Sequence, residues 1–279
     1  MTTRFAYQGV AGAFGEEAAI AVAGSGAELV ACPRFSSVFD AVVSGSAARG
    51  VVPIENTLAG AVHEVYDLLG TRSDVTIVGE SVLRIAHALI APPGVELEAV
   101  RRVFSHPVAL AQCESLFRAH PDWQPIAAFN TAGAVQEVLA RAEGDAAAIA
   151  SRRAADRYGG VVLRDGVEDH PQNFTRFLTI AARTAVRDAG VGMHKTSLVL
   201  TLEHRPGTLA RVLSTFAARG IDLSKIESRP MHGKPFEYLF YVDVAGDAQV
   251  EPLASALSEV RSEVASLRVL GSYVAAAAP

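Results

Sequence analysis

The stretch GVVPIENTLAGAV, residues 50–62, decides the fold of the first part of the chain. Its first five residues form a continuous apolar run, which is typical of a strand that helices cover on both faces. Glu55 and Asn56 follow this run directly, at the carboxyl end of the predicted strand. Because ligands of open α/β sheets bind outside the carboxyl ends of the strands, both residues are candidates for a binding cleft. A second interpretation stays open, in which Asn56 only ends the strand and caps the following helix.

Short apolar runs of the same kind recur through the first 180 residues, with helix-length segments between them. They predict strands at residues 5–7, 28–31, 50–54, 75–78, 83–90, 102–104, 126–129, 146–150 and 174–181. Ser105 is interpreted as the N-cap of one helix, with Pro107 at its first position, and Thr131 as the cap of the next. This alternation predicts an α/β region with a mainly parallel sheet.

A second domain is predicted beyond residues 184–195, a stretch without a clear period that we interpret as a linker. The pattern restarts with a strand at 196–203, a turn at 204–207 and an amphipathic helix at 208–219. Two strands, a helix and a last strand follow at residues 223–229, 236–244, 250–264 and 267–273. The order βαββαβ over residues 196–275 predicts a ferredoxin-like unit.

Composition and charge exclude several classes of protein. The chain has 279 residues, of which 50% are hydrophobic, so it can bury the cores of two domains and is not globally disordered. The net charge of −5 and the lack of a long basic run argue against nucleic acid as a partner. No apolar run reaches membrane-spanning length, no signal peptide is predicted, and Cys32 and Cys113 are too isolated for a disulfide scaffold. We therefore expect a cytoplasmic globular protein with neither a membrane nor a nucleic-acid partner.

Four stretches of the first region resemble prephenate dehydratases in their order and spacing. They are YQGVAGAFGEEAA at residues 7–19, GVVPIENTLAGAV at 50–62, SHPVALAQC at 105–113 and NFTRF at 173–177. The second region resembles the ACT domain of such enzymes through RPGTLARVL at residues 205–213 and ESRP at 227–230.

This resemblance implies a catalytic domain of two α/β lobes, arranged as in periplasmic binding proteins, with the active site in the cleft between them. The catalytic domain would span residues 1–183. Residues 1–79 and 165–183 would form one lobe, and residues 80–164 the other. The regulatory ACT domain would span residues 196–275.

The family converts prephenate to phenylpyruvate in phenylalanine biosynthesis, with loss of carbon dioxide and hydroxide. Aromatisation drives this reaction, so the resemblance implies no cofactor and no metal. The sequence has no G-x-S-x-G motif, no cysteine cluster, and no second histidine at metalloprotease spacing after His63. Two alternatives stay open. One is an arogenate or cyclohexadienyl dehydratase, which acts on the amino analogue of prephenate, and the other is a non-catalytic amino-acid sensor with a similar cleft.

The essential threonine of the family matches Thr175. A hydroxyl can donate a hydrogen bond to the departing oxygen, although an unperturbed threonine is a very weak acid. Arg176 offers a fork of donors that suits a substrate carboxylate, and Glu55 would orient Thr175 or polarise the substrate hydroxyl. Without the resemblance, Thr175 and Arg176 would be interpreted as a strand-edge threonine and an outward arginine. The implied catalytic residues are Thr175, Glu55, Asn56 and Gln112.

Substrate binding is expected mainly at helix starts, where free N–H groups attract anions such as a dianionic substrate. The G-x-x-G-x-x-G turn at residues 9–15 is interpreted as a carboxylate-binding turn. A plain cap and a solvated imidazole are the alternative for Ser105 and His106, and a surface position is the alternative for Gln112. The expected substrate-binding residues are Arg176, Ser105, His106, Asn130, Thr131, Asn173 and Phe177.

ACT domains resemble one another in pairing side by side, which holds an amino acid between two copies. The implied effector is phenylalanine, and the implied assembly is a homodimer or homotetramer. Gly207 would let a ligand approach closely, and the helix start at Thr208 would offer N–H groups to its carboxylate. The alternative is that Gly207 only permits a tight turn and that Glu227 and Arg229 are solvated edge charges. The expected effector-binding residues are Arg205, Pro206, Gly207, Thr208 and Leu209 of one copy, with Glu227, Ser228, Arg229 and Pro230 of the other.

Overall fold

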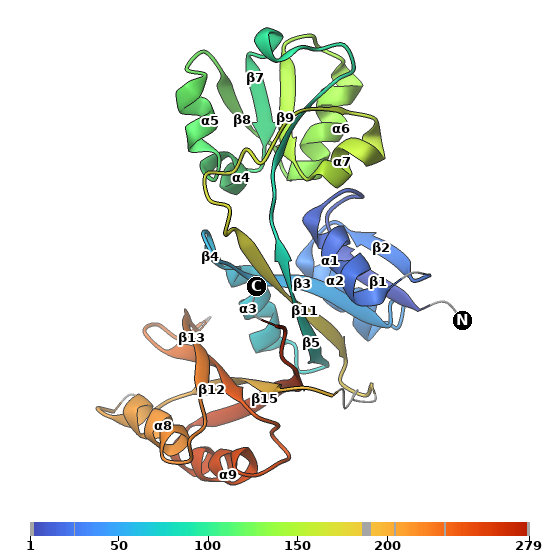
Figure 1. Cartoon of the computed structure of the whole chain (residues 1–279). Coiled ribbons are helices and arrows are strands. Elements are labelled where there is room, and N and C mark those ends of the chain that lie inside the picture. The colour runs from blue at the N-terminus through green and yellow to red at the C-terminus, as the bar shows by residue number, and fades with distance from the viewer. Residues whose placement is uncertain (1–2, 25, 186–190, 204, 232, 278–279) are drawn as a thin grey trace.

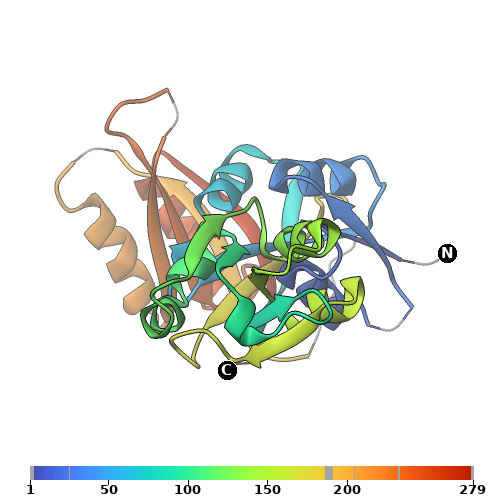
Figure 2. The same cartoon turned by 90° about the horizontal axis from the view of Figure 1, so that it is seen from above.

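The computed structural model describes residues 3–24, 26–185, 191–203, 205–231 and 233–277. Within these ranges the chain forms three β-sheets, one in each of three units. Figure 1 shows the first lobe between the second lobe and the C-terminal domain, and Figure 2 shows the chain from above, with the second lobe in front. Residues 1–2 of the predicted first lobe, residues 186–190 of the predicted linker and His204 of the predicted turn lie outside the described ranges. No helix in the described part of the chain is long and apolar enough to cross a membrane.

The first lobe is built on a mixed sheet with the strand order β2-β1-β3-β11-β5, to which the short strand β4 is added beside β3. The three N-terminal strands are parallel, whereas β11 runs antiparallel to both β3 and β5. Helix α1 covers one face of the sheet, and α2 and α3 cover the other. The elements are β1 (Arg4–Gln8), α1 (Phe14–Ala23), β2 (Glu28–Cys32), α2 (Phe35–Val43), β3 (Arg49–Asn56), β4 (Gly60–Ala61), α3 (His63–Thr71), β5 (Val75–Arg84) and β11 (Phe174–Ala182).

The second lobe is a five-stranded mixed sheet in the order β10-β6-β9-β7-β8. The strand expected at residues 83–90 is divided, because β5 continues to Arg84 in the first sheet and β6 begins at Ala88 in the second. The lobe boundary therefore lies after Arg84 and not at residue 79. Both sheets are mixed and not mainly parallel, since the strands that connect the lobes run antiparallel to their neighbours. The elements are β6 (Ala88–Ala91), η1 (Leu97–Ala99), β7 (Arg102–Ser105), α4 (Pro107–Ala111), α5 (Glu114–Ala119), β8 (Gln124–Ala127), α6 (Thr131–Arg141), β9 (Ala146–Ala150), α7 (Arg152–Tyr158) and β10 (Val161–Asp165).

The C-terminal domain has the predicted order βαββαβ in an antiparallel sheet, β13-β14-β12-β15. Apolar side chains spaced along α8, such as Val212 and Phe216, bury one face of that helix against the sheet. The elements are β12 (His194–Thr201), α8 (Thr208–Ala217), β13 (Leu223–Pro230), β14 (Tyr238–Ala245), α9 (Leu253–Glu263) and β15 (Ser266–Val274).

The sheet of the C-terminal domain packs against the first lobe through the face that carries no helices. Val199, Tyr241 and Tyr273 share one hydrophobic cluster with side chains of α2 and α3. At Gly271 the two units approach so closely that a Cβ atom would overlap the Ile77 carbonyl oxygen. The two units are therefore in direct contact, and the C-terminal sheet supports the side of the first lobe that faces away from the second lobe (Figure 1).

Candidate active site in the inter-lobe cleft

A cavity of about 550 Å3 lies between the two lobes and is the candidate active site. The first lobe contributes the ends of β1, β3 and β11 and the start of α1, and the second lobe contributes α4 and the start of α6. The polar lining consists of Gln8, Asn56, Glu64, His87, His106, Gln112, Asn130, Thr131 and Thr175. The lining residues that the structure describes include no lysine and no arginine, so an anion bound here would meet N–H groups, neutral side chains and one carboxylate, that of Glu64.

A β-bulge between β3 and β11 decides which side chains face this cavity. Arg176 pairs with Glu55 and the next residue of β11 pairs with Pro53, so Ile54 has no partner on β11. In a regular strand Pro53 and Glu55 would share a face, but the extra residue exchanges the two faces beyond it. Asn56 therefore lines the cavity together with Pro53, and Glu55 points to the opposite face.

Asn56 holds the hydroxyl of Thr175 in one orientation. Its Oδ1 accepts hydrogen bonds from the backbone N–H groups of residues 58 and 59, at 3.0 and 2.8 Å, which fixes the direction of the amide. Its Nδ2 donates to Thr175 Oγ1 at 2.9 Å, and also faces Asn173 Oδ1 at 2.7 Å and the carbonyl oxygen before Thr175 at 3.1 Å. The Thr175 oxygen thus accepts, and its hydrogen has no acceptor among the described residues. Thr175 and Phe177 both line the cavity, as predicted.

Gln112 extends this network to His87, which sequence analysis did not select. Gln112 Nε2 donates to Asn56 Oδ1 at 3.2 Å, so its Oε1 faces the other way and accepts from Asn173 Nδ2 at 3.1 Å. His87 Nε2 lies 3.0 Å from the same oxygen and therefore donates to it. Nδ1 of this ring is buried without a partner in the described part of the chain, and burial lowers the pKa of His87. The sequence feature that could have identified His87 is its position as the one polar residue inside the run IAHALI.

Asn173 does not line the cavity, although it was expected to bind substrate. Its side chain is fully buried and lies behind Asn56 and Gln112, which it connects through hydrogen bonds. Asn173 therefore orients these two amides and does not contact the cavity.

The helix starts of the second lobe differ from the predicted caps. His106, and not Ser105, is the N-cap of α4, and its Nδ1 accepts from the backbone N–H two residues on, at 3.2 Å. The Ser105 hydroxyl is buried and donates to the Ile149 carbonyl oxygen at 2.6 Å, so it does not reach the cleft. Asn130, and not Thr131, caps α6, because its Oδ1 accepts from the N–H three residues on. His106, Asn130 and Thr131 line the cavity, and partial burial lowers the pKa of His106.

The turn at residues 9–15 joins the two lobes at one edge of the cavity. Ser151 Oγ of the second lobe donates to the Gly12 carbonyl oxygen at 2.7 Å. Gly12 has a φ of +85°, and a Cβ atom there would lie 2.8 Å from Ala154 Cα, so this contact requires glycine. Helix α1 starts after the turn without a capping side chain, and its first residues line the cavity. This helix start could offer N–H groups to an anion in the cavity, and carboxylate binding at the turn stays a prediction.

Arg176 and Glu55, both expected in the cleft, lie on the opposite face of the first lobe. The Arg176 guanidinium pairs with Glu80 and Asp243, with N···O distances of 2.6 and 2.7 Å. The Glu55 carboxylate accepts a hydrogen bond from Lys225 at 2.8 Å. Neither residue lines the cavity, so the expected carboxylate contact of Arg176 and the expected cleft role of Glu55 do not agree with the structure. Strand alternation in β11 and the bulge in β3 are the physical reasons.

Comparisons with known proteins identify the family. A family model of prephenate dehydratase matches residues 5–185, and an ACT domain model matches residues 196–262. The chain belongs to the prephenate dehydratase family. It is 42% identical over 285 residues to arogenate dehydratase/prephenate dehydratase 2, chloroplastic, of Arabidopsis thaliana, in an alignment that covers 97% of this chain and 72% of the relative.

Two solved structures resemble this family member over almost its whole length. The prephenate dehydratase of Arthrobacter aurescens in complex with L-Phe is 33% identical, with a TM-score of 0.89 and coverage of 98% of this chain and 90% of that one. GqqA, described as a novel type of quorum quenching acylase, is also 33% identical, with a TM-score of 0.88 and coverage of 98% of both chains. The predicted family and its two-part architecture are confirmed, while the cytoplasmic location stays a prediction.

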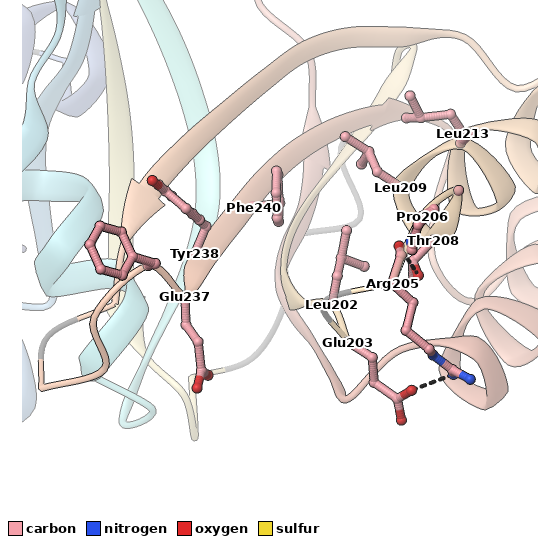
Figure 3. Close-up of a pocket in the computed structure, with 13 residues that line it drawn as sticks. Leu202, Glu203, Arg205, Pro206, Thr208, Leu209, Leu213, Glu237, Tyr238 and Phe240 are labelled. Atoms are coloured by element: carbon pink, nitrogen blue, oxygen red, sulfur yellow. Dashed lines mark hydrogen bonds and ion pairs between the residues drawn. The ribbon is translucent and has the colours of Figure 1, made fainter.

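The ACT domain contains a cavity of about 630 Å3 on the side of α8 (Figure 3). Tyr238 and Phe240 line it opposite the turn that precedes α8 (Figure 3), and Phe236 also belongs to the lining. Gly207 has a φ of +83°, and the Thr208 hydroxyl donates to the carbonyl oxygen of residue 205 at 2.9 Å, which closes the turn. The predicted effector residues that line this cavity are Arg205, Pro206, Gly207, Thr208 and Leu209.

The other predicted effector residues, on β13, do not line this cavity within one chain. Glu227 and Arg229 face the first lobe, where Arg229 Nη2 pairs with Asp67 at 2.9 Å. They are therefore not solvated edge charges. Ser228 and Pro230 alternate with them and are exposed on the other face of the strand.

Proposed function

We propose that the protein catalyses the decarboxylating dehydration of prephenate to phenylpyruvate. The observation on which this proposal rests is the orientation of the Thr175 hydroxyl. Because Asn56 occupies its oxygen as a donor, its hydrogen is available to a group in the cleft. A hydrogen-bond donor fixed in advance is what a departing hydroxide requires.

The proposed reaction needs only the substrate and one proton from solvent. The bond between the ring and its carboxylate breaks, and the electron pair enters the ring as carbon dioxide leaves. The bond from the opposite ring carbon to its hydroxyl oxygen breaks, while Thr175 donates a hydrogen bond to that oxygen and a solvent proton completes the water. Positioned donors and acids of this kind typically contribute about 10²–10⁴-fold in rate.

The absence of lysine and arginine from the described lining of the cleft supports the loss of a carboxylate. A fixed cation would stabilise the ring carboxylate before the reaction and lose that contact as carbon dioxide forms, which would raise the barrier. The starts of α1 and α6 line the cavity and offer N–H groups instead. These groups would hold the side-chain carboxylate, which is retained in the product.

Arogenate is a second candidate substrate, and one residue favours it. Glu64 of α3 is the one carboxylate in the described lining, and arogenate carries an ammonium group where prephenate has a keto group. The plant relative is named for both activities. If Glu64 pairs with that ammonium, Glu64→Gln should lower kcat/KM for arogenate about tenfold or more and leave the value for prephenate within about threefold. Equal losses on both substrates would exclude this role.

The decisive experiment is to add prephenate and arogenate separately to the purified protein and to follow phenylpyruvate and phenylalanine. Thr175→Ala should remove the activity on whichever substrate reacts. An acyl amide supplied in parallel tests the activity named for the acylase neighbour. Failure of the wild-type protein to form either aromatic product would refute the proposed function.

We further propose that phenylalanine inhibits the enzyme by binding at the ACT domain of a homodimer or homotetramer. The ACT domain and the L-Phe complex of the Arthrobacter relative support this proposal. The effector would contact the turn at residues 205–209 of one copy and the exposed residues Ser228 and Pro230 of the other. Inhibition by phenylalanine and scattering mass measurements test it, and a monomer at micromolar concentration would contradict it.

A further inference from the structure

The face of the first lobe that points away from the cleft contains a buried ionic cluster. Arg176 Nε donates to Glu80 Oε2 at 2.6 Å, and its Nη1 lies 2.7 Å from Asp243 Oδ2 on β14 of the ACT domain. Lys195 Nζ donates to the other Glu80 oxygen at 2.7 Å. The side-chain exposures are 15% for Arg176, 2% for Glu80 and 11% for Asp243, so salt screens these pairs only weakly. Although burial opposes it, Arg176 and Lys195 hold the pKa of Glu80 below its ordinary value.

A second ion pair connects β3 to the same regulatory sheet. Lys225 of β13 donates to Glu55 Oε1 at 2.8 Å, and its side chain is 14% exposed. Lys225 also lies 3.7 Å from Glu227, which points toward the first lobe. The ACT domain thus has an ionic contact to each of the two strands that carry the cleft amide and hydroxyl.

Each of these anchors is one residue away from a cleft residue. Thr175 is paired with Asn56 across the two strands, and Arg176 is paired with Glu55. Because successive side chains of a strand point to opposite faces, one pair faces the cleft and the other faces the ACT domain. We propose that Arg176 and Glu55 are positioning residues through which the ACT domain holds Thr175 and Asn56 in their cleft geometry. The kinetic part of this proposal rests on the dehydratase function proposed above, and the structural part does not.

The hydrogen bond between Asn56 and Thr175 makes the site sensitive to small movements of these strands. Its length is 2.9 Å, and N–H···O bonds are normally no longer than about 3.2 Å. Among the described residues, Arg176 without Asp243 keeps only the Glu80 carboxylate, which it shares with Lys195, and without Lys225 the Glu55 carboxylate, whose side chain is 34% exposed, has no cation beside it. Each loss removes a contact that holds one strand against the ACT domain, so that strand can shift. Because misplacing a reacting group by about 1 Å can cost about 10²-fold in rate, loss of one of two anchors should cost about tenfold.

Two substitutions in the ACT domain test this proposal without changing a cleft residue. Asp243→Asn keeps the shape of the side chain and an acceptor for Ser197 Oγ but removes the charge opposite Arg176. Lys225→Met removes the partner of Glu55. Each should lower kcat about tenfold and change KM by less than about twofold, because the hydroxyl and amide are misplaced while the rest of the cleft is intact.

Asp67→Asn is the matched control. It weakens the ion pair to Arg229, which also joins β13 to the first lobe but reaches α3 and not β3 or β11. Its kcat should stay within about twofold of wild type. Unchanged kcat in both Asp243→Asn and Lys225→Met, or an equal loss in Asp67→Asn, would overturn the proposal, since the effect would then reflect domain contact in general.

Amide hydrogen exchange supplies a readout that does not depend on activity. In the full-length protein, exchange in peptides covering residues 50–60 and 172–180 should be at least about threefold faster in Asp243→Asn and Lys225→Met than in wild type or Asp67→Asn. Exchange equal to wild type in these peptides would refute the anchoring. If the wild-type protein is inactive on both substrates, the proposed function fails, and the exchange measurement still decides whether the ACT domain holds the two strands.

Discussion

Replacing Asn56 by aspartate should reverse the hydrogen bond that prepares Thr175. The oxygen that takes the place of Nδ2 can only accept when the carboxyl is ionised, so the Thr175 hydroxyl would donate to it and not to the substrate. The same oxygen would also face Asn173 Oδ1 at 2.7 Å, a contact between two acceptors. Loss of a positioned donor costs about 10²–10⁴-fold, or about 2.7–5.4 kcal/mol of barrier, and we expect kcat to fall within that range.

The pH dependence of the Asn56→Asp variant gives a second, independent test of the hydrogen bond to Thr175. Neighbouring acceptors disfavour the charged carboxylate, so the pKa of the new group should lie above the ordinary aspartate range. Protonation restores a donor toward Thr175, and activity should therefore recover as pH falls, relative to wild type. Thr57→Val is a suitable control, because the Thr57 hydroxyl bonds only to backbone groups of Gln172 and of Phe174 at the start of β11, and water can replace those exposed bonds. Steady-state phenylpyruvate formation from pH 5 to 9 measures both effects. A folded Asn56→Asp protein with kcat within threefold of wild type would refute this account of Thr175.

Substitutions at four further positions test other parts of the molecule. Thr175→Ala should abolish turnover while calorimetry still detects substrate binding, and Thr175→Ser should keep measurable activity because the hydroxyl survives. Burial lowers the pKa of His87, so the stability that the neutral ring contributes is complete above the pH range in which an ordinary histidine titrates and is lost as the pH falls below that range. Chemical denaturation should therefore show that His87→Gln loses less stability in acid than the wild-type protein does. Gly207→Val should stay active but lose inhibition by phenylalanine, since a φ of +83° disfavours a branched side chain. Gly271→Ala should lower the melting temperature, because the new Cβ would overlap the Ile77 carbonyl oxygen.

The features that follow from local patterns were predictable from the sequence. The helix expected at residues 208–219 is α8, Thr208–Ala217, and its apolar spacing also indicated which face it buries. The ACT domain has the predicted order of elements for the same reason. Thr175, Asn56 and Gln112 were selected through family motifs, and all three line the cleft.

The positions of Glu55 and Arg176 could not be obtained in the same way. Counting alternation from Pro53 places Glu55 in the cleft, and only the pairing with β11 shows that Ile54 is an extra residue. The partner of Glu55, Lys225, is 170 residues away along the chain and belongs to another domain. Arg176 was expected to bind a substrate carboxylate because its guanidinium offers a fork of donors. Its buried carboxylate partners, Glu80 and Asp243, come together with it only in the folded protein.

Strands β3 and β11 place charged side chains on the face toward the ACT domain and neutral amides on the face toward the cleft, and each arrangement suits its surroundings. At the ACT interface, paired charges such as Arg176 and Asp243 are directional, and they fix how the two units fit together because a shifted register would leave a buried charge unpaired. In the cleft, a cation such as Arg176 would hold the carboxylate that leaves in the proposed reaction. An anion such as Glu55 would compete with Asn56 for the Thr175 hydroxyl. Glu55 and Asn56 point to opposite faces because they are neighbours in a strand, and the bulge at Ile54 determines that Glu55 joins the ionic groups and Asn56 the neutral amides. Deletion of Ile54 should remove the bulge and leave Arg176 paired with Glu55 and Phe177 with Pro53, so Glu55 and Asn56 should keep their faces and the variant should keep turnover if it folds.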